Sequence, residues 1–301
     1  MKDMLVIGLA ATLLAATPPA DAAIRILATT ADWGALANEL GGDKVDVYTA
    51  TNALQDVHRV DAKPSLIARA RTADLVVATG AELEMGWLPV LLRESGNREV
   101  QPGTSGYFEA AAYVTLIDVP TRFDRSMGDI HSMGNPHIQL DPHNIQKVAA
   151  ALTDRLEQID PGHAEDYRKR GADFQGRWAA AIERWEARAA PLEGVPIVVM
   201  HQDQNYLSHW LGLDQLGSIE PKPGVPPSAG YLAQLVRQLS ARPPRLILIN
   251  AYNDPKAADW LSGKVDAPVV TLPFSVGGTE RAKDLFGLFD DTIDRMLEAL
   301  K

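Results

Sequence analysis

Residues 163–189 contain no proline, and large apolar side chains recur through them at helical spacing. Trp178, Ile182 and Trp185 fall on one face, because positions three and four apart meet on an α-helix. A helix of about 28 residues is roughly 42 Å long, which is more than one small lobe needs. The pattern therefore predicts a rigid helix that joins two lobes; two shorter helices bent at one of the two internal glycines are the alternative.

Before this segment, short runs rich in β-branched residues alternate with helical patterns. The predicted strands are Ile24–Thr30, Val45–Thr49 and Leu75–Thr79, with a strand-like run at Tyr113–Val119, and the predicted helices are Asp32–Leu40, Pro64–Ala73 and Asn144–Ile159. A near-continuous apolar run such as Leu75–Thr79 is typical of a buried parallel strand. The alternation predicts an α/β lobe with a parallel sheet.

The same alternation returns after the long helical segment. Strands are predicted at Ile197–Met200, Leu246–Asn250 and Val269–Leu272, and helices at Tyr206–Leu211 and Lys283–Leu300. The stretch "LVVATGAELEMGWL" in the first half is echoed by "LILINAYNDPKAADWL" in the second, which hints at two similar lobes. The predicted fold class is α/β, with two lobes (residues 23–160 and 191–301), parallel-type sheets and one long linking helix (residues 161–190).

The first 22 residues have a separate pattern. Lys2 precedes the apolar run Met4–Ala16, and Ala20-Asp21-Ala22 supplies an A-x-A ending. A charged start, a short apolar stretch and small residues at the end are typical of a secretory signal peptide, with a buried N-terminal helix as the alternative. The apolar run is shorter than the roughly 20 residues that a membrane-spanning helix needs.

Charge and cysteine content narrow the possible partners. The chain has no cysteine, so an exported form has no disulfide and no thiol to carry a lipid anchor. We therefore expect a soluble protein in the bacterial periplasm, whose metal chemistry would depend on histidine and carboxylate. The formal net charge of -10 argues against a nucleic-acid partner, because phosphate binding needs a basic surface.

Candidate metal ligands follow the ends of predicted strands in both halves. His201 comes directly after a strand, His58 and His137 lie in loops that follow strands, and Glu280 follows the last strand across Gly277-Gly278. In parallel α/β sheets, ligands gather at the carboxyl ends of the strands. We therefore expect these four side chains to face one cleft between the lobes, and three imidazoles with one carboxylate suit tetrahedral zinc.

The other histidines have simpler explanations, and each candidate ligand taken singly also fits an ordinary polar or capping role. His143 and His163 are expected at helix starts or on the surface, and His209 is expected inside a short helix, packed against Trp210 or the lobe surface. His131, in the glycine-containing loop Arg122–Gly134, is an auxiliary candidate that would catch a metal in transit.

Three stretches around these histidines resemble the metal-specific solute-binding proteins of ABC transporters. "DVHRVDAKPSLIARARTADLVVATGAELEMGWLPVLL" is similar to that family's first-lobe signature, and "NPHIQLDPHN" matches its "NPH-x-W-x-DP" segment with Gln139 in place of the tryptophan. "HQDQNYLSHWLGL" looks like its third ligand segment. The resemblance covers nearly the whole chain after the first 22 residues, in order.

The resemblance implies two α/β lobes joined by a rigid helix, with a metal held between them by His58, His137 and His201. Histidine at the third position is typical of zinc members, whereas manganese members tend to carry a carboxylate there. The family usually supplies an aspartate late in the second lobe; here Glu280 is the first carboxylate in the matching stretch and Asp284 is the next. The long histidine-rich loop of many zinc members is reduced here to Arg122–Gly134.

The predicted function is therefore that of a periplasmic receptor that captures Zn²⁺ and delivers it to the permease of an ABC importer. We expect a monomer and leave open a periplasmic zinc chaperone that hands over the ion. Manganese or iron binding by the same fold is one alternative. A zinc hydrolase is another, although a fourth protein ligand would close the position that a catalytic zinc keeps open for water, and no H-E-x-x-H, G-x-S-x-G or phosphate loop is present.

Overall fold

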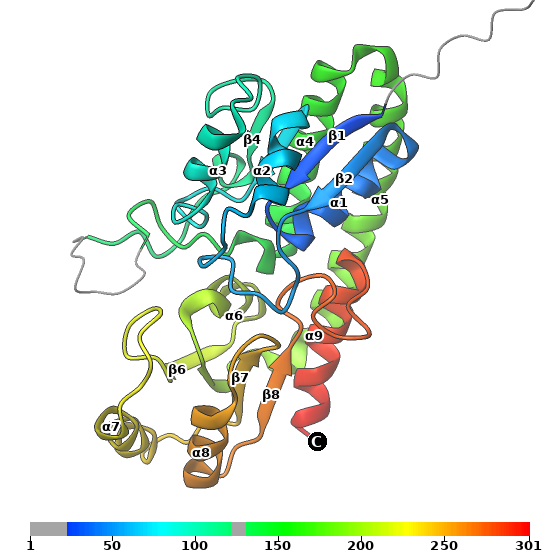
Figure 1. The fold of residues 1–301 in the computed structure, drawn as a ribbon. Helices are drawn as coiled ribbons and strands as arrows, with labels where there is room; N and C mark the ends of the chain where they lie inside the picture. The colour runs from blue at the N-terminus through cyan, green and yellow to red at the C-terminus, as the bar shows by residue number, and fades with distance from the viewer. Residues whose placement is uncertain (1–22, 122–130) are drawn as a thin grey trace, which may run out of the picture.

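The computed structural model describes residues 23–121 and 131–301, and these form two α/β lobes (Figure 1). The first lobe is built on a parallel sheet with the strand order β2-β1-β3-β4. Its strands are β1 (Ile24–Ala28), β2 (Val45–Thr49), β3 (Leu75–Ala78) and β4 (Tyr107–Glu109). Its helices are α1 (Ala31–Gly41), α2 (Pro64–Thr72), α3 (Leu88–Ser95) and α4 (Pro142–Ile159).

The second lobe repeats this plan with the strand order β6-β5-β7-β8, again all parallel. Its strands are β5 (Pro196–Val199), β6 (Asp214–Ser218), β7 (Leu246–Asn250) and β8 (Val269–Leu272). Its helices are α6 (Asn205–Leu211), α7 (Ala229–Leu239), α8 (Lys256–Val265) and α9 (Leu285–Ala299). The two segments that echo each other in the sequence contain β3 and β7, which occupy the same place in their sheets.

A single long helix, α5 (Ala164–Ala189), runs along both lobes (Figure 1). It is 26 residues long and continues through both internal glycines, so the alternative of two shorter helices is wrong. Gly171 lies where α5 meets α4, and a Cβ atom there would stand 2.6 Å from Oγ1 of Thr153. The missing side chain therefore allows the two helices to approach closely.

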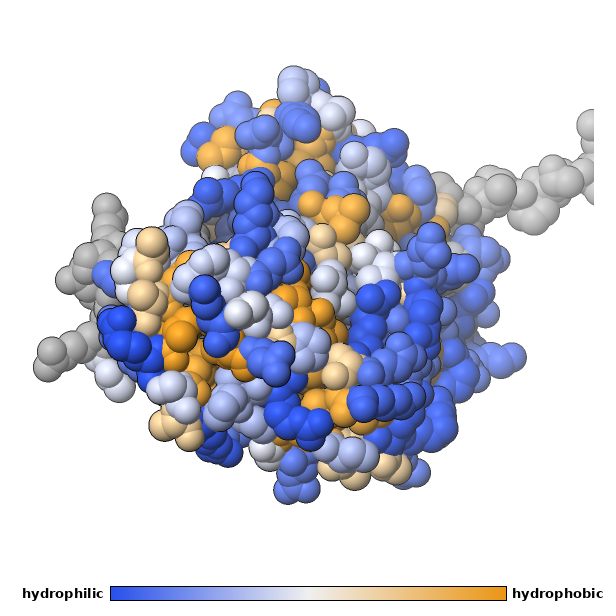
Figure 2. Space-filling view, turned by 90° about the horizontal axis from the view of Figure 1, so that it is seen from below, coloured by the Kyte–Doolittle hydropathy of each residue, from blue (hydrophilic) through white to orange (hydrophobic). Residues whose placement is uncertain are grey.

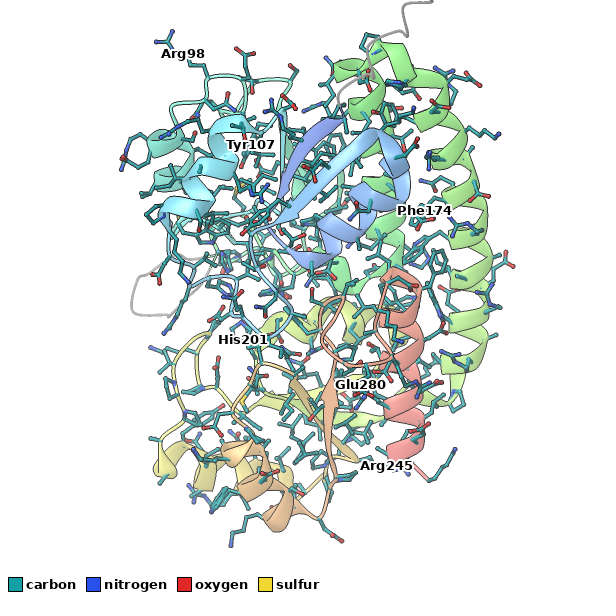
Figure 3. All side chains as sticks on the ribbon, turned by 45° about the vertical axis from the view of Figure 1, so that its right-hand side comes forward. Arg98, Tyr107, Phe174, His201, Arg245 and Glu280 are labelled. Atoms are coloured by element: carbon teal, nitrogen blue, oxygen red, sulfur yellow. The ribbon has the colours of Figure 1, made fainter. Side chains whose placement is uncertain are left out.

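Aromatic side chains fix α5 to the elements beneath it. Trp178 lies 5.1 Å from both Phe174 and Trp185, measured between ring centroids, and Trp185 lies 4.9 Å from Phe289 of α9. Figure 3 shows Phe174 on the side of α5 that faces the rest of the molecule. These rings belong to one buried cluster that includes residues of both sheets, so α5 is packed into a core shared by the two lobes.

The structure confirms the predicted fold class and most of the predicted elements, whose ends shift by one or two residues. The strand-like run Tyr113–Val119 is wrong: β4 ends at Glu109, a short 3₁₀ helix covers Ala110–Tyr113, and the chain then continues without a strand. α3, β4, β6, α7 and α8 were not predicted.

The described part of the chain holds no helix that is both long enough and apolar enough to cross a bilayer. The predicted signal peptide and residues 122–130 of the loop Arg122–Gly134 lie outside the described residues. Seen from the end of the second lobe, hydrophilic residues cover most of the side along which α5 and α9 run (Figure 2).

Candidate metal centre

Four histidines from both lobes converge at the junction between the lobes. The Nε2 atoms of His58 and His131 are 3.2 Å apart. The ring centroid of His137 lies 5.4 Å from that of His58 and 5.9 Å from that of His201, and His58 and His201 are 6.3 Å apart. Two nitrogens bound to one tetrahedral zinc at 2.0–2.1 Å would be roughly 3.3–3.4 Å apart, which is close to the observed Nε2 separation.

His58 stands in the loop after β2, oriented by a carboxylate. Asp56 accepts hydrogen bonds from the backbone N of His58 at 3.0 Å and from its Nδ1 at 2.8 Å. With the proton on Nδ1, the lone pair of Nε2 is directed toward the other histidines. Burial acts to raise the pKa of Asp56, but its contacts with His58 prevail and lower it. Trp87 anchors the loop by donating from Nε1 to the carbonyl of Val57 at 2.9 Å.

His201 follows β5 directly and has an equivalent carboxylate partner. Oε2 of Glu220 accepts from Nδ1 of His201 at 2.7 Å and from the backbone N of Gly224 at 2.9 Å. Burial alone would lower the pKa of His201, but the charges of Asp203 and Glu220 outweigh it and raise the pKa to about 9. The surroundings of His201 therefore favour a positive charge at this position, whether a proton or a metal ion supplies it.

Asp203 adds a buried carboxylate beside His201. It is fully buried and accepts hydrogen bonds from the hydroxyl of Tyr252 at 2.9 Å and from Nδ2 of Asn250. Burial raises the pKa of Asp203, while the charge of His201 acts to lower it. Asp56, Asp203 and Glu220 thus surround the histidines with enough negative charge to balance a divalent cation.

His137 lies deepest in the cluster. It is 4% exposed, and its Nδ1 has no hydrogen-bond partner among the described residues. Burial, followed by the neighbouring rings of His58 and His201, holds the pKa of His137 well below its ordinary value. A neutral buried imidazole with an unpaired nitrogen fits a ligand for a metal ion, since an unpaired buried polar atom costs free energy.

The segment that carries His137 is tied to the second lobe. Asn135 donates from Nδ2 to the carbonyl of Gln202 at 2.9 Å, and its own carbonyl accepts from the hydroxyl of Tyr206 at 2.9 Å. The backbone N of His137 in turn donates to Oδ1 of Asn135 at 3.0 Å. His137 and His201 therefore keep a defined spacing although they belong to different lobes.

The structure does not bring Glu280 or Asp284 to the histidines. Glu280 is exposed and lies beside α9, whereas His201 lies at the junction of the lobes (Figure 3). Asp284 begins α9 and accepts from the backbone N of Gly287 at 2.7 Å. The loop after β8 instead presents Phe274, whose ring centroid is 5.7 Å from that of His137.

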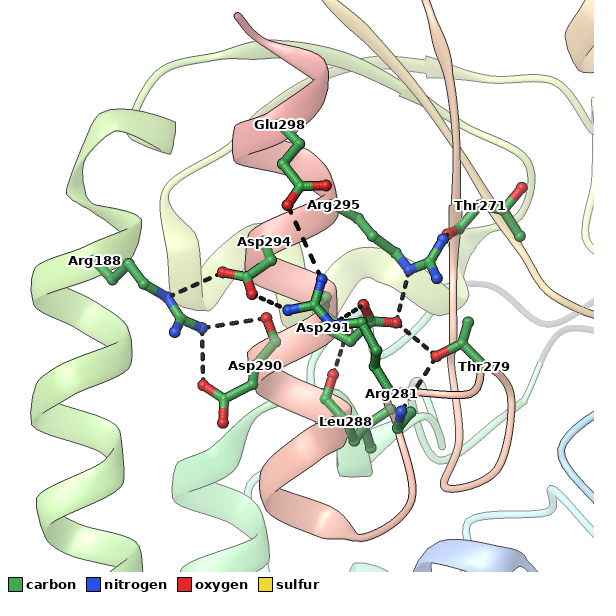
Figure 4. A network of polar contacts seen from close by, with 12 residues as sticks. Arg188, Thr271, Thr279, Arg281, Leu288, Asp290, Asp291, Asp294, Arg295 and Glu298 are labelled. Carbon is green, nitrogen blue, oxygen red and sulfur yellow. Dashed lines mark hydrogen bonds and ion pairs between the residues drawn. The ribbon is translucent and has the colours of Figure 1, made fainter.

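A polar network holds this loop against α9 (Figure 4). Asp291 is fully buried and accepts from Oγ1 of Thr279 at 2.5 Å and from Nε of Arg295 at 2.7 Å. Arg281 pairs with both Asp291 and Asp294. The residues on both sides of Glu280 are therefore fixed to α9, which turns Glu280 away from the cleft.

Two cavities meet at His201. One, of about 250 Å³, is lined by Asp118, His131, Asn135 and His137, and the other, of about 310 Å³, is lined by Asp56, His58, Glu220 and Tyr252. Among residues 23–121 and 131–301, no three His, Asp or Glu side chains are already arranged as a finished metal shell. The rings would therefore have to rotate slightly to close a metal shell around the position they surround.

The remaining histidines have the local roles that the sequence predicted. Nδ1 of His143 pairs with Asp141 at the start of α4, and Nδ1 of His163 pairs with Asp160. His209 is exposed on α6. The sequence analysis missed Asp56, Glu220 and Asn135; Asp56 and Asn135, each two residues before a candidate ligand, could have been found from sequence proximity, whereas Glu220 could not.

Comparisons with known proteins identify the family. A family model described as "Zinc-uptake complex component A periplasmic" matches residues 26–299. The high-affinity zinc uptake system protein ZnuA of Paracoccus denitrificans is 24% identical, over 97% of this chain and 95% of its own length. ZnuA of Yersinia pestis is 26% identical over 60% of this chain, and that match spans only 61% of the relative.

A manganese relative and a solved structure are also similar to the chain. The manganese ABC transporter substrate-binding lipoprotein PsaA of Streptococcus anginosus is 21% identical, over 92% of this chain and 89% of its own length. A crystal structure of ZnuA has the same fold, with a TM-score of 0.78, 20% identity, and coverage of 93% of this chain and 100% of that one.

Proposed function

The chain belongs to the family of periplasmic A components of zinc-uptake complexes, and on this premise we propose that it captures Zn²⁺ between its lobes and delivers the ion to an ABC importer permease. The observation that carries the proposal is the convergence of His58, His137 and His201 from separate loops of two lobes. The family consists of substrate-binding transport components, so the protein is not an enzyme and the hydrolase alternative is set aside.

Zinc is the proposed cargo because of the donor atoms that surround the site. Imidazole nitrogen suits zinc, whereas manganese prefers carboxylate, carbonyl and water oxygens. The carboxylates nearest the histidines, Asp56 and Glu220, are hydrogen-bonded to imidazoles and so act as their orienting partners. Manganese remains the alternative cargo, since a relative named for manganese matches over 92% of this chain.

The proposed ligands are His58, His137 and His201, with His131 as the fourth. His131 is favoured over Glu280 because its Nε2 already lies 3.2 Å from that of His58. A ligand role for Glu280 would require residues 277–284 to leave the polar network on α9. Asp284 would have to give up its hydrogen bond at the start of α9 as well.

The binding step follows from the charges around the site. A histidine must be neutral to bind a metal, so Zn²⁺ displaces the proton that the carboxylates stabilise on His201. Asp56 and Glu220 then hold the two imidazoles in the tautomer that offers Nε2 to the ion. Their negative charges also offset part of the ion's charge in the partly buried site.

The cellular setting is proposed on the same basis. Residues 1–22 would be removed as a signal peptide, and the remainder would act in the periplasm as a monomer made of lobes 23–160 and 191–301 and the helix 161–190. The permease is the expected partner, and a zinc-donating chaperone stays an open possibility.

The test is titration of the metal-free protein with Zn²⁺ in competition with a chelator of known affinity. Alanine at His58, His137 or His201 should weaken binding by more than the roughly 10–100-fold that loss of an outer partner costs. His209→Ala, on the exposed face of α6, is the matched control and should bind as the parent does. Equal binding by all four proteins would overturn the proposed site.

The cargo and the fourth ligand are tested in the same assay. Mn²⁺ should fail to displace Zn²⁺ at equal concentrations, and displacement would favour the manganese alternative. Glu280→Ala should leave zinc affinity unchanged, whereas His131→Ala should lower it. The reverse result would show that residues 277–284 move to the site when zinc binds.

A further inference from the structure

The turn after β3 has a backbone that most residues avoid. Gly80, Ala81 and Glu82 all have positive φ, at 81°, 49° and 69°, and only the first is glycine. Residues with a Cβ atom are disfavoured in this region, and such strain persists only where the surroundings hold it. Here the carboxylate of Glu84 accepts from the backbone N of Thr79 and Gly80, at 2.8 and 3.0 Å, and fixes the start of the turn.

The turn directs Glu82 to the segment that carries His131. Oε2 of Glu82 accepts from the backbone N of Ser132 at 2.5 Å, and Oε1 accepts from its Oγ at 2.7 Å. One carboxylate thus holds both donors of a residue that is 50 positions away in the sequence. Ser132 is the direct neighbour of His131, so fixing its backbone limits where the imidazole of His131 can reach.

We propose that Glu82 is a positioning residue that holds His131 at the metal site through Ser132. This inference rests on the proposed function, because it assigns His131 to the zinc shell. Among the described residues, two backbone hydrogen bonds also hold this segment: Gly134 N donates to the carbonyl of His131, and Asn135 N donates to the carbonyl of Ile117. Without Glu82, more of the ordering of His131 would have to occur during zinc binding, which weakens the binding.

Glu82 does not act as a ligand in this arrangement. Both of its oxygens are engaged by Ser132, and its charge reaches the site only through the position of His131. The turn aims the side chain of Glu82 across to Ser132, while the backbone N of Ala81 donates to Oε1 of Glu109 at 3.2 Å.

The experiment compares zinc affinity and metal-free stability in the full protein for Glu82→Gly, Glu82→Gln, Ser132→Ala and His131→Ala. Glycine relieves the unfavourable φ while removing the carboxylate, so Glu82→Gly should keep the metal-free melting temperature and lose about tenfold in zinc affinity. Glu82→Gln keeps one acceptor oxygen and should lose less. Glu94→Ala, an exposed carboxylate on α3, should bind as the parent does.

The double variant Glu82→Gly/His131→Ala decides the mechanism. If Glu82 acts through His131, the double variant should bind zinc no more weakly than His131→Ala alone. Bound Co²⁺ gives a second readout, because its visible absorption depends on its ligands: the spectrum of Glu82→Gly should shift toward that of His131→Ala. Ser132→Ala repeats the test in a milder form, because it removes the hydrogen bond from the hydroxyl to Glu82 and keeps the one from the backbone N.

Additive losses, an unchanged affinity of Glu82→Gly, or an unchanged affinity of His131→Ala would each overturn the inference. The proposed function would stand in all three cases if His58→Ala and His201→Ala still abolish tight binding. If those two variants also bind zinc normally, the proposed function itself fails. The two failures are therefore distinguishable within one set of proteins.

Discussion

Zinc binding should displace close to one proton from His201 per ion at neutral pH. Only the neutral imidazole binds a metal, whereas the pKa of His201 is about 9, because the carboxylates of Asp203 and Glu220 outweigh the lowering by burial. With this pKa, proton competition should weaken the apparent affinity about ninefold from pH 8 to pH 7. The dependence should level off above pH 9, where His201 is already neutral.

The assay is calorimetric titration of the metal-free protein at pH 7, 8 and 9.5, each in two buffers with different enthalpies of ionisation. The difference in heat between the buffers gives the number of protons released. We expect a value near one from His201 at pH 7 and 8, falling toward zero at pH 9.5. Equal affinities at pH 7 and 8 with no proton release would refute the reasoning about His201.

The variant Glu220→Gln separates charge from shape in this prediction. The amide oxygen can still accept from Nδ1 of His201, but the negative charge that raises the pKa of His201 is lost. The pH range of the affinity change should therefore move to lower pH. At pH 9.5 the affinity should fall about 10–100-fold, or roughly 1.4–2.7 kcal/mol, as for other outer partners of metal ligands. Glu193→Gln, an exposed carboxylate in the second lobe, is the control.

Substitutions away from the histidines test the packing and the contact between the lobes. Trp178→Ala should lower the free energy of unfolding in urea by about 3–5 kcal/mol while one zinc still binds, and a smaller loss would contradict the shared core. Gly171→Ala should lower the free energy of unfolding by about 1–3 kcal/mol, because the new Cβ would meet Thr153. Gly176 has open space around it, so Gly176→Ala should leave the free energy of unfolding unchanged or raise it by up to about 1 kcal/mol. Asp32→Asn should flatten the pH dependence of the melting temperature of the metal-free protein between pH 4 and 6. Burial raises the pKa of Asp32 from 3.8 to about 6. The stability that its proton contributes is therefore fully present below pH 3.8 and is lost as the pH rises through 6. An unchanged pH profile in that variant would contradict the assignment.

Helices and strands whose apolar residues repeat regularly could be predicted from the sequence, whereas segments without such a repeat could not. α5 was found because its apolar residues repeat over seven turns without a proline, which no loop imitates. The error at Tyr113–Val119 has a simple cause: β-branched residues favour extended backbone, but a strand also needs a neighbour with which to pair. β4 took that place in the sheet beside β3, at Tyr107–Glu109.

The candidate site likewise has some features that could be predicted from the sequence and others that could not. His58 and His201 were brought together by a general property of parallel sheets, whose carboxyl ends share one edge. The position of Glu280 could not be predicted in this way, because it depends on Asp291, a buried residue of α9 that pairs with Arg281. Glu220 was missed for a related reason, since it follows a strand that the sequence did not reveal.

The contacts around α5 and the histidines bear on how an ion could enter and leave. Trp178 of α5 donates to the carbonyl of Pro142 in the first lobe, and Trp185 donates to Asp290 in the second. Between the lobes, Asp32 of α1 accepts from Ser275 in the loop after β8. A hinge opening would have to break several of these contacts together, including part of the shared core, so it is a costly route for each transport cycle.

Movement of single loops is the less costly route. His58 and His131 both lie in connecting segments, each held by a few hydrogen bonds to partly exposed carboxylates, Asp56 and Glu82. His137 and His201, in contrast, are buried or follow a core strand directly. The geometry therefore divides the proposed zinc shell into a fixed half and a movable half. A partner that draws either carboxylate away would loosen the movable half and lower the affinity without separating the lobes.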